Sequence, residues 1–189
     1  QFLPLLLKRP VKAEEQKWLA GKEIETPGLV AQTFRITNPN CEGRSVAEIN
    51  PRRLAQVNLS RVKHGERVFA ATPETILRLG DVVMAVGPAD ELDKMTLLLG
   101  EQTAERMDVN AEVLSVDVEV MDESLTGKTL AHTRVWEQFT VVITRIRRQG
   151  LEIVPQGRVT LEMGDGIRVV GEKSAVDAFV QRAQGSPRR

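Results

Sequence analysis

The basic side chains of this chain gather at positions where they could bind an anion. Two clusters surround two predicted β-turns; their members are Arg61, Lys63, His64 and Arg67 in one, and Arg145, Arg147 and Arg148 in the other. Arg44 and Lys128 each stand where a short helix is expected to begin. Guanidinium groups and the unpaired N–H groups of a helix N-terminus both favour anionic ligands. The chemistry that these residues could perform is therefore recognition of a small anion.

Three interpretations of these charges remain open. The first is a small anionic effector, a nucleotide being one candidate, in a cleft that two halves of the chain share; its ligands would be Arg44, Arg61, Lys128 and Arg145. The second is contact of the basic turns with anionic lipid headgroups. The third, which the sequence alone favours, is a solvated basic face whose local partners are Glu42, Glu48 and Glu66.

Catalytic and metal-binding patterns are lacking in the sequence. It has two histidines and one cysteine, and it contains no P-loop and no Gly-x-Ser-x-Gly motif. A cluster of cysteine and histidine ligands for a metal is not expected, and Cys41 is interpreted as a small apolar filler. We predict no catalytic residue, no metal and no cofactor other than the effector, so the chain is not expected to be an enzyme.

The composition is that of an ordinary soluble globular protein. The 189 residues are 41% hydrophobic and 28% charged, and 26 basic residues balance 26 acidic ones. Because the net charge is zero, a nucleic-acid partner is not expected. The single cysteine excludes an intrachain disulfide and fits a reducing compartment. No apolar run approaches the roughly 20 residues that a membrane-spanning helix needs.

An internal repeat with an offset of 84 residues organises the chain. Leu79-Gly80-Asp81 precedes an apolar run that ends at Gly87, and Met163-Gly164-Asp165 precedes a run that ends at Gly171. A Gly-Asp pair before an apolar run signals a turn followed by a strand. Turn glycines, residues before short helices and apolar faces agree at the same offset, which indicates a duplication.

Each copy is predicted to contain the elements β-α-β-β-β-α. In the first copy, strands are expected at 30–36, 55–62, 68–70 and 82–86, and helices at 45–53 and 91–99. Ser45 and Glu48 form a capping-box pattern at the start of the first helix. Asp90 and its equivalent Ser174 are expected to cap the second helix of each copy, and Gly100 is expected to end that helix in the first copy.

The pattern divides the chain into four parts. We predict an N-terminal arm with a short connecting helix (1–27), a first domain (28–103), a second domain (111–184) and a flexible tail (185–189). The predicted fold class is α+β, with the two domains packed as a pseudo-dimer. Such packing is expected because a unit of this size has a small core that pairing would stabilise.

The repeated pattern resembles the TrkA C-terminal domain, which is also called the C-terminal lobe of the RCK domain. In the first copy the resemblance rests on the stretch from Gly43 to Ile49 and on Leu79-Gly80-Asp81 with Val86-Gly87. In the second copy it rests on Gly127-Lys128-Thr129-Leu130-Ala131 and on Met163-Gly164-Asp165 with Val170-Gly171. It covers residues 28–100 and 112–183. In this family, the cleft between paired domains is where small ligands such as cyclic di-AMP can bind.

Two such domains in tandem are similar to the cytosolic loop of transporters of the aspartate:alanine exchanger type. This resemblance implies a regulatory domain pair on the cytoplasmic face of the cell membrane, within a secondary transporter that exchanges its substrates. The pair would sense an effector and mediate homodimerisation. Its partners would be a second copy and the transmembrane helices of the same polypeptide.

Several alternatives to this function stay open. Sodium/sulfate-type carriers also carry such domains, and the pair could serve a potassium transport system or act as a dimerisation scaffold without a ligand. The N-terminal stretch from Phe2 to Leu7, followed by Lys8 and Arg9, could be the end of a membrane helix with cytoplasmic charges. The alternative, which this stretch alone favours, is a hydrophobic arm that packs on the domain.

Overall fold

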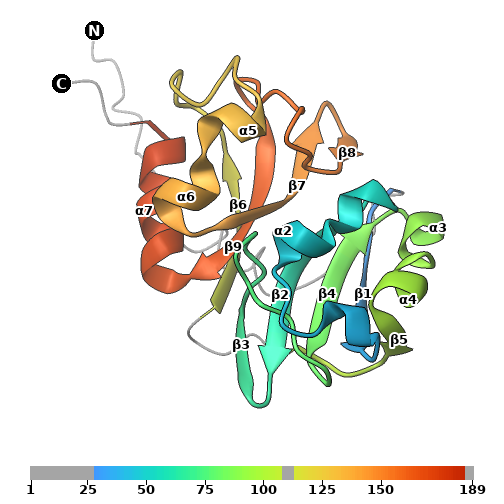
Figure 1. Cartoon of the computed structure of the whole chain (residues 1–189). Helices are drawn as coiled ribbons and strands as arrows, with labels where there is room; N and C mark the ends of the chain where they lie inside the picture. Colours follow the sequence, from blue (N-terminus) through green and yellow to red (C-terminus); the bar gives the residue numbers. More distant parts are fainter. Residues whose placement is uncertain (1–27, 108–112, 186–189) are drawn as a thin grey trace, which may run out of the picture.

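The computed structural model describes residues 28–107 and 113–185. The predicted N-terminal arm, its connecting helix and residues 186–189 of the predicted tail lie outside the described residues. In Figure 1 two units lie side by side, with α7 at the outer side of one unit and α3 and α4 at the outer side of the other. Each unit is an antiparallel sheet with helices packed on one face.

The first unit contains five strands, and its sheet has the order β3-β2-β4-β1-β5. Its elements are β1 (Val30–Ile36), η1 (Pro39–Cys41), α2 (Val46–Ile49), η2 (Pro51–Arg53), β2 (Asn58–His64), β3 (Arg67–Ala70), β4 (Val82–Gly87), α3 (Ala89–Leu92), α4 (Met95–Leu98) and β5 (Gly100–Thr103). All of its strand pairs are antiparallel.

In its described residues, 113–185, the second unit repeats this arrangement without a counterpart of β5. Its elements are β6 (Val113–Glu119), α5 (Leu130–Thr133), α6 (Val135–Phe139), β7 (Val142–Arg148), β8 (Leu151–Ile153), β9 (Gly166–Glu172) and α7 (Lys173–Ala183). Its sheet order is β6-β9-β7-β8. These strands are the repeat equivalents of β1, β4, β2 and β3, so the two sheets share one strand order. The α+β class and the tandem repeat are therefore confirmed.

The repeat extends to an irregularity that the two sheets share. The register of β2 on β4 shifts between Leu59 and Arg61, and that of β7 on β9 shifts between Ile143 and Arg145, at the same offset. Within these bulges, the buried Ser60 hydroxyl donates to the Met84 carbonyl at 3.2 Å, and Thr144 makes the equivalent bond to the Arg168 carbonyl at 3.3 Å. A hydroxyl in each bulge thus satisfies a backbone acceptor of the neighbouring strand.

Several helix boundaries differ from the prediction. The Ser45–Glu48 capping box is present, but α2 ends at Ile49 because Asn50 adopts a left-handed conformation and Pro51 starts a 3-10 turn. The helix predicted at 91–99 is two short helices, α3 and α4. Asp90 and Ser174 do not cap; the capping positions are Pro88 and Glu172, neither of which makes a side-chain capping bond.

The segment after Gly100 is also different. Gly100 ends the helical region as predicted, but residues 100–103 continue as the edge strand β5, which pairs with β1. A Cβ on Gly100, whose φ is +133°, would lie 2.2 Å from the Thr37 hydroxyl oxygen, so this crossing from helix to strand needs a glycine.

The predicted apolar faces form the two cores. In the first unit the buried side chains of β1, β2 and β4 pack against Leu92, Met95 and Leu99. In the second unit β7 and β9 pack against Val176 and Phe179 of α7. Cys41 is buried in the first core, as expected for a filler, and its thiol donates to the Leu98 carbonyl at 3.2 Å.

The repeated Gly-Asp pair has a structural role. The Asp81 carboxylate is buried, accepts the Arg78 backbone N–H at 2.9 Å and lies 2.6 Å from His64 Nδ1. Asp165 is buried in the same way and accepts the Glu162 N–H at 2.9 Å. Each aspartate therefore holds together the turn that leads into β4 or β9.

The glycine that ends each repeated stretch marks a close approach of two chain segments. A Cβ on Gly87 would lie 2.7 Å from the Gln56 carbonyl oxygen and 2.8 Å from Val57 Cγ1. We expect Gly87→Ala to lower the free energy of unfolding by about 1–3 kcal/mol, because the added methyl overpacks this contact. Urea unfolding followed by circular dichroism measures the change. The control is Gly166→Ala, whose Cβ would contact Arg147 Cβ at 3.7 Å; equal stability of the two variants would contradict the prediction.

Candidate functional site

The two units meet through two small apolar clusters that are related by the repeat. One cluster comprises Ala70, Val113, Val142 and Val170, and the other comprises Leu29, Val86 and Val154. Val154 is the repeat equivalent of Ala70, and Val170 is that of Val86. Each unit therefore presents the same patch to the other. This reciprocity is the mark of a two-fold interface, here a pseudo-two-fold one within one chain.

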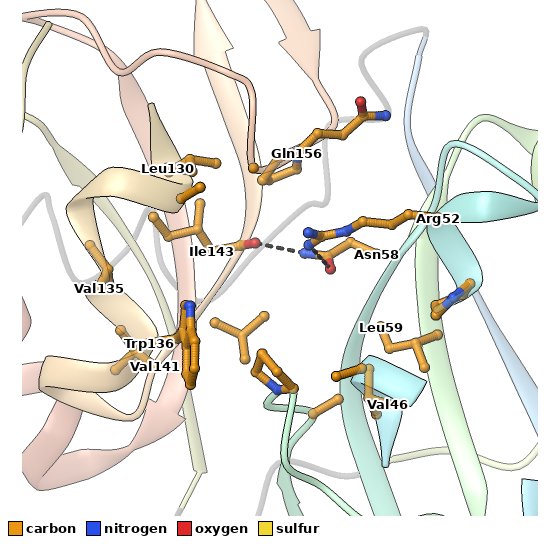
Figure 2. A pocket seen from close by; sticks show the side chains of 18 of the residues that line it. Val46, Arg52, Asn58, Leu59, Leu130, Val135, Trp136, Val141, Ile143 and Gln156 are labelled. Carbon is orange, nitrogen blue, oxygen red and sulfur yellow. Dashed lines mark hydrogen bonds between the residues drawn. The ribbon is translucent and has the colours of Figure 1, made fainter. Parts of the chain in front are cut away.

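A buried hydrogen bond also joins the units at this interface. The Asn58 side chain of β2 donates from Nδ2 to the Ile143 carbonyl of β7 at 2.7 Å (Figure 2). On its other side, Asn58 Oδ1 accepts a hydrogen bond from Arg52 Nη2 at 2.8 Å. Asn58 is 5% exposed, so a single amide links the η2 turn, β2 and the second unit.

A cavity of about 310 Å³ opens beside this amide, between the units. Its first-unit wall consists of α2, the η2 turn, the start of β2 and the segment after β3; its second-unit wall consists of α5, α6, the start of β7 and residues 155–157. The volume is at the low end of the range for small-molecule sites. Figure 2 shows Val46 and Arg52 on one wall and Leu130 and Trp136 on the other.

Arg52 is the charged residue of an otherwise apolar and neutral lining. The residue as a whole is exposed, but partial desolvation of its guanidinium at the cavity lowers the pKa of Arg52. Among the described residues, Arg52 forms no ion pair. Its hydrogen-bond partner is the side chain of Asn58, which is neutral. A partly desolvated cation without a counter-charge favours an anion in the cavity.

The four residues predicted to bind an anion lie elsewhere and do not line this cavity. Arg44 is exposed before α2, where its Nη2 donates to the Glu48 carbonyl at 2.9 Å. Lys128 is exposed before α5. Arg61 is buried on β2 with Nη1 3.5 Å from Met84 Sδ. Arg145 on β7 has Nη1 3.5 Å from Glu152 Oε1. The residues that sequence reasoning missed are Arg52 and Asn58.

Comparison with known proteins places this arrangement in a family. The TrkA-C domain family matches the chain twice, over residues 31–100 and 116–184. The chain belongs to the TrkA-C domain family. The two matches fall on the two units of the structure, so the chain is a tandem pair of TrkA-C domains.

Relatives of this TrkA-C pair are named as transport proteins. A "Putative transport protein" of Glaesserella parasuis is 30% identical over 180 residues, which cover 95% of this chain and 33% of the relative. An uncharacterized transporter of Bacteroides fragilis is 28% identical over 176 residues, 93% of this chain and 33% of the relative. The chain thus spans about a third of the length of these relatives. In its described part, no helix combines the length and the apolar character needed to cross a bilayer.

Solved structures with a similar fold include RCK domains. The GsuK RCK domain aligns with a TM-score of 0.40 and 10% identity, over 82% of this chain and 63% of that chain. The RCK C domain of the potassium transport protein KtrA, solved in complex with cyclic diadenosine monophosphate, aligns with a TM-score of 0.35 and 21% identity. That alignment covers 49% of this chain and 95% of the KtrA domain.

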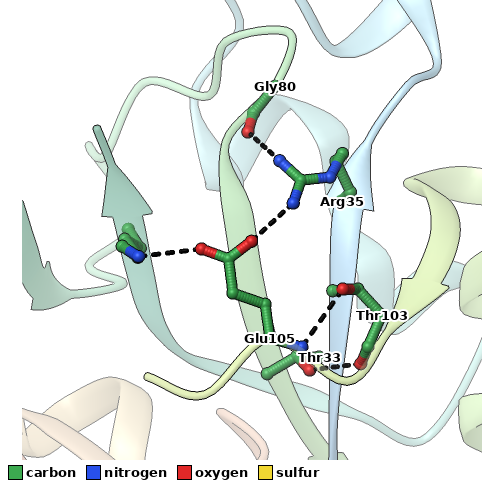
Figure 3. A network of polar contacts seen from close by, with 6 residues as sticks. Thr33, Arg35, Gly80, Thr103 and Glu105 are labelled. Carbon is green, nitrogen blue, oxygen red and sulfur yellow. Dashed lines mark hydrogen bonds and ion pairs between the residues drawn. The ribbon is translucent and has the colours of Figure 1, made fainter. Parts of the chain in front are cut away.

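The segment that leaves the first TrkA-C unit is tied to the sheet face opposite the helices. Glu105, just after β5, accepts a hydrogen bond from Lys63 of β2 at 2.8 Å and pairs with Arg35 of β1 (Figure 3). Lys63 and Arg35 are both paired in register with Val82 of β4. One carboxylate therefore bridges β1 and β2 across β4 and compensates two of the basic groups of this face.

We expect Glu105→Gln to destabilise the chain at pH 7 and to reduce the pH dependence of its stability in acid. The hydrogen bond from Lys63 is the largest of the interactions that keep the pKa of Glu105 below its ordinary value of 4.5. A lowered pKa in the folded state stabilises the fold above the ordinary pKa, and this contribution is lost as the pH falls through the lowered value. Thermal unfolding between pH 3 and pH 7 measures it. Glu101→Gln on the exposed β5 is the matched control, and equal pH profiles for both variants would contradict the prediction.

Proposed function

We propose that this TrkA-C pair is the cytosolic regulatory part of a membrane secondary transporter of the aspartate:alanine exchanger type. We further propose that a small anionic effector binds in the cavity between its units. The observation that carries the proposal is Arg52, a partly desolvated cation that enters a cavity walled by both units. The names of the relatives and the third of their length that the chain spans support the transporter context.

The position of the cavity explains how an effector could act. A ligand that contacts both walls stabilises the arrangement in which the walls face each other, and its binding energy would shift the balance between transporter states that differ in this arrangement. The transmembrane helices of the same polypeptide would receive this change on the cytoplasmic side of the membrane. A second copy of the chain would complete a homodimer.

A dimerisation scaffold without a ligand is the second candidate. It is favoured by the two apolar clusters and by the Asn58–Ile143 hydrogen bond, which hold the units together without any effector. This scaffold would have the same fold and the same place in the transporter, but its cavity would be a by-product of the duplication.

A ligand screen with matched variants distinguishes the two candidates. We expect amino acids, organic anions or nucleotides from a thermal-shift panel to raise the Tm of this chain, and we expect Arg52→Ala to remove the shift. Arg53→Ala is the control, because Arg53 is the exposed neighbour that does not line the cavity. The hits are then added to the full-length transporter in liposomes. A panel without any shift, or hits that leave transport unchanged, would favour the scaffold.

The four residues named from the sequence provide a second set of variants for the same screen. If alanine at Arg44, Arg61, Lys128 or Arg145 removes the thermal shift while Arg52→Ala keeps it, the effector binds at the basic turns and helix starts and not in the cavity. We expect the opposite result, since none of the four lines the cavity.

A further inference from the structure

Many lining residues of the cavity are equivalent in the repeat, and among the pairs whose two members both line it, two differ in chemistry. Most equivalent pairs are apolar on both walls; they include Val46 and Leu130, Ala47 and Ala131, and Leu59 and Ile143. The exceptions are Arg52, whose equivalent is Trp136, and Asn58, whose equivalent is Val142. The cation and the amide of the first wall thus correspond to an indole and an isopropyl group on the second.

The first wall provides one site for one negative charge. Arg52 uses one N–H on Asn58 and retains further donors, and it has no carboxylate partner among the described residues. Within residues 28–107 and 113–185, the cavity lining contains no acidic side chain that could compete for the guanidinium. One guanidinium balances a group of charge −1, whereas a phosphate monoester, with a charge of −1.5 to −2, would bring excess negative charge into a largely apolar space.

The second wall provides a flat apolar surface in place of a second cation. Trp136 is partly buried and lines the cavity beside Val135 and Val141 (Figure 2), and Val142 belongs to the same lining. An anionic group placed on this wall would lose its hydration without gaining a counter-charge, which is costly. A planar ring placed there would stack on the indole, a favourable contact for aromatic groups.

We propose that the effector is an unsymmetrical monoanion, with one carboxylate-like group on Arg52 and a flat, preferably aromatic, body against Trp136. It binds as one molecule per chain and in one orientation, because the two walls are not interchangeable. A ligand with two equivalent anionic ends does not fit, although the fold of the cavity is pseudo-symmetric. This inference rests on the proposed function, since it specifies the effector of the same cavity.

The test uses pairs of probes that differ only in charge. Phenylacetate, indole-3-acetate and nicotinate are compared with their neutral amides, and succinate and cyclic diadenosine monophosphate serve as probes with two anionic groups. Binding is followed by the fluorescence of Trp136 in a Trp18→Phe background, which leaves Trp136 as the chain's one tryptophan. We expect at least one acid to bind about tenfold or more tightly than its amide, as a charge-assisted bond to Arg52 implies.

Variants of Arg52 and Trp136, with one control at Arg53, assign the two halves of the ligand. Arg52→Ala should remove the difference between acid and amide, Arg52→Lys should restore part of it, and Arg53→Ala should leave it unchanged. Trp136→Leu should weaken acid and amide by the same factor, as measured by calorimetry, because both contain the same ring. Trp136→Arg, which places a second cation at the equivalent position, should shift the preference toward the probes with two anionic groups. Circular dichroism checks that each variant is folded.

The outcomes separate this inference from the proposed function. If amides bind as tightly as acids, or if the probes with two anionic groups bind more tightly than the monoanions, the inference is wrong while the effector cavity stands. If no probe of any class binds, the proposed effector cavity fails, and the inference fails with it.

Discussion

Replacing Asp165 by alanine is expected to lower the free energy of unfolding by about 2–3 kcal/mol, because it removes the buried acceptor of a partly buried, charge-assisted pair of hydrogen bonds. Asp165 is 1% exposed. Its carboxylate accepts hydrogen bonds from Arg148 Nε at 2.8 Å and from Arg148 Nη2 at 2.7 Å. It also accepts the Glu162 backbone N–H at 2.9 Å. The variant would leave this N–H without an acceptor and would leave the guanidinium with only the more exposed Glu162 as an ionic partner.

The measurement is urea unfolding at pH 7, with an exposed ion pair as the control. Asp177 pairs with Lys173 at 2.7 Å on the surface of α7, and Asp177→Ala should cost less than about 1 kcal/mol, as exposed pairs do. Hydrogen bonding to Asp165 raises the pKa of the Arg148 guanidinium, so Arg148 stays charged at the pH of the measurement. A loss for Asp165→Ala as small as that for Asp177→Ala would show that the carboxylate does not hold this turn.

The parts of the fold that follow from local chemistry were predictable from the sequence. Gly80-Asp81 and Gly164-Asp165 encode turns through positive φ and side-chain capping, and the structure uses them as such. The capping box at Ser45 is equally local. These signals act over three or four residues, so a single sequence contains them in full.

The errors in the fold arise where distant parts of the chain decide the structure. Residues 100–103 have no alternating apolar pattern, and they become β5 because the edge of β1 offers them backbone partners. The first helix stops before Arg53 because Asn50 turns left-handed ahead of Pro51. Neither feature changes the hydrophobic periodicity on which the prediction of strands and helices rests.

The candidate site was harder to predict because its importance depends on the second unit. Arg52 was placed within a predicted helix and, unlike the residues of the basic turns, has only Arg53 as a basic neighbour in the sequence. Its significance comes from the wall that faces it, and that wall is formed by residues more than 70 positions away, such as Leu130 and Trp136. The sequence does contain one usable signal, which is that a basic residue and an indole occupy the same position of the two repeats.

Replacing Phe179 by alanine is expected to lower the free energy of unfolding by about 3–5 kcal/mol, the usual cost of deleting a buried ring. Phe179 of α7 is fully buried, and its ring meets that of Phe139 in α6 edge to face, with centroids 5.5 Å apart and an interplanar angle of 73°. The deletion would leave a cavity between α6, α7 and the sheet and would also remove this aromatic pair. Leu151→Ala is the control, because that side chain is 70% exposed.

The same variant tests whether the two TrkA-C units unfold together. The apolar clusters and the Asn58–Ile143 hydrogen bond join the units, so we expect Phe179→Ala to shift a single unfolding transition. Trp136 fluorescence, measured in a Trp18→Phe background, reports the second unit, and circular dichroism reports both. Coincident transitions would show that the units form one cooperative body, in which an effector at the interface can influence both. If fluorescence changes first and circular dichroism follows in a second step, the interface is too weak to couple the units.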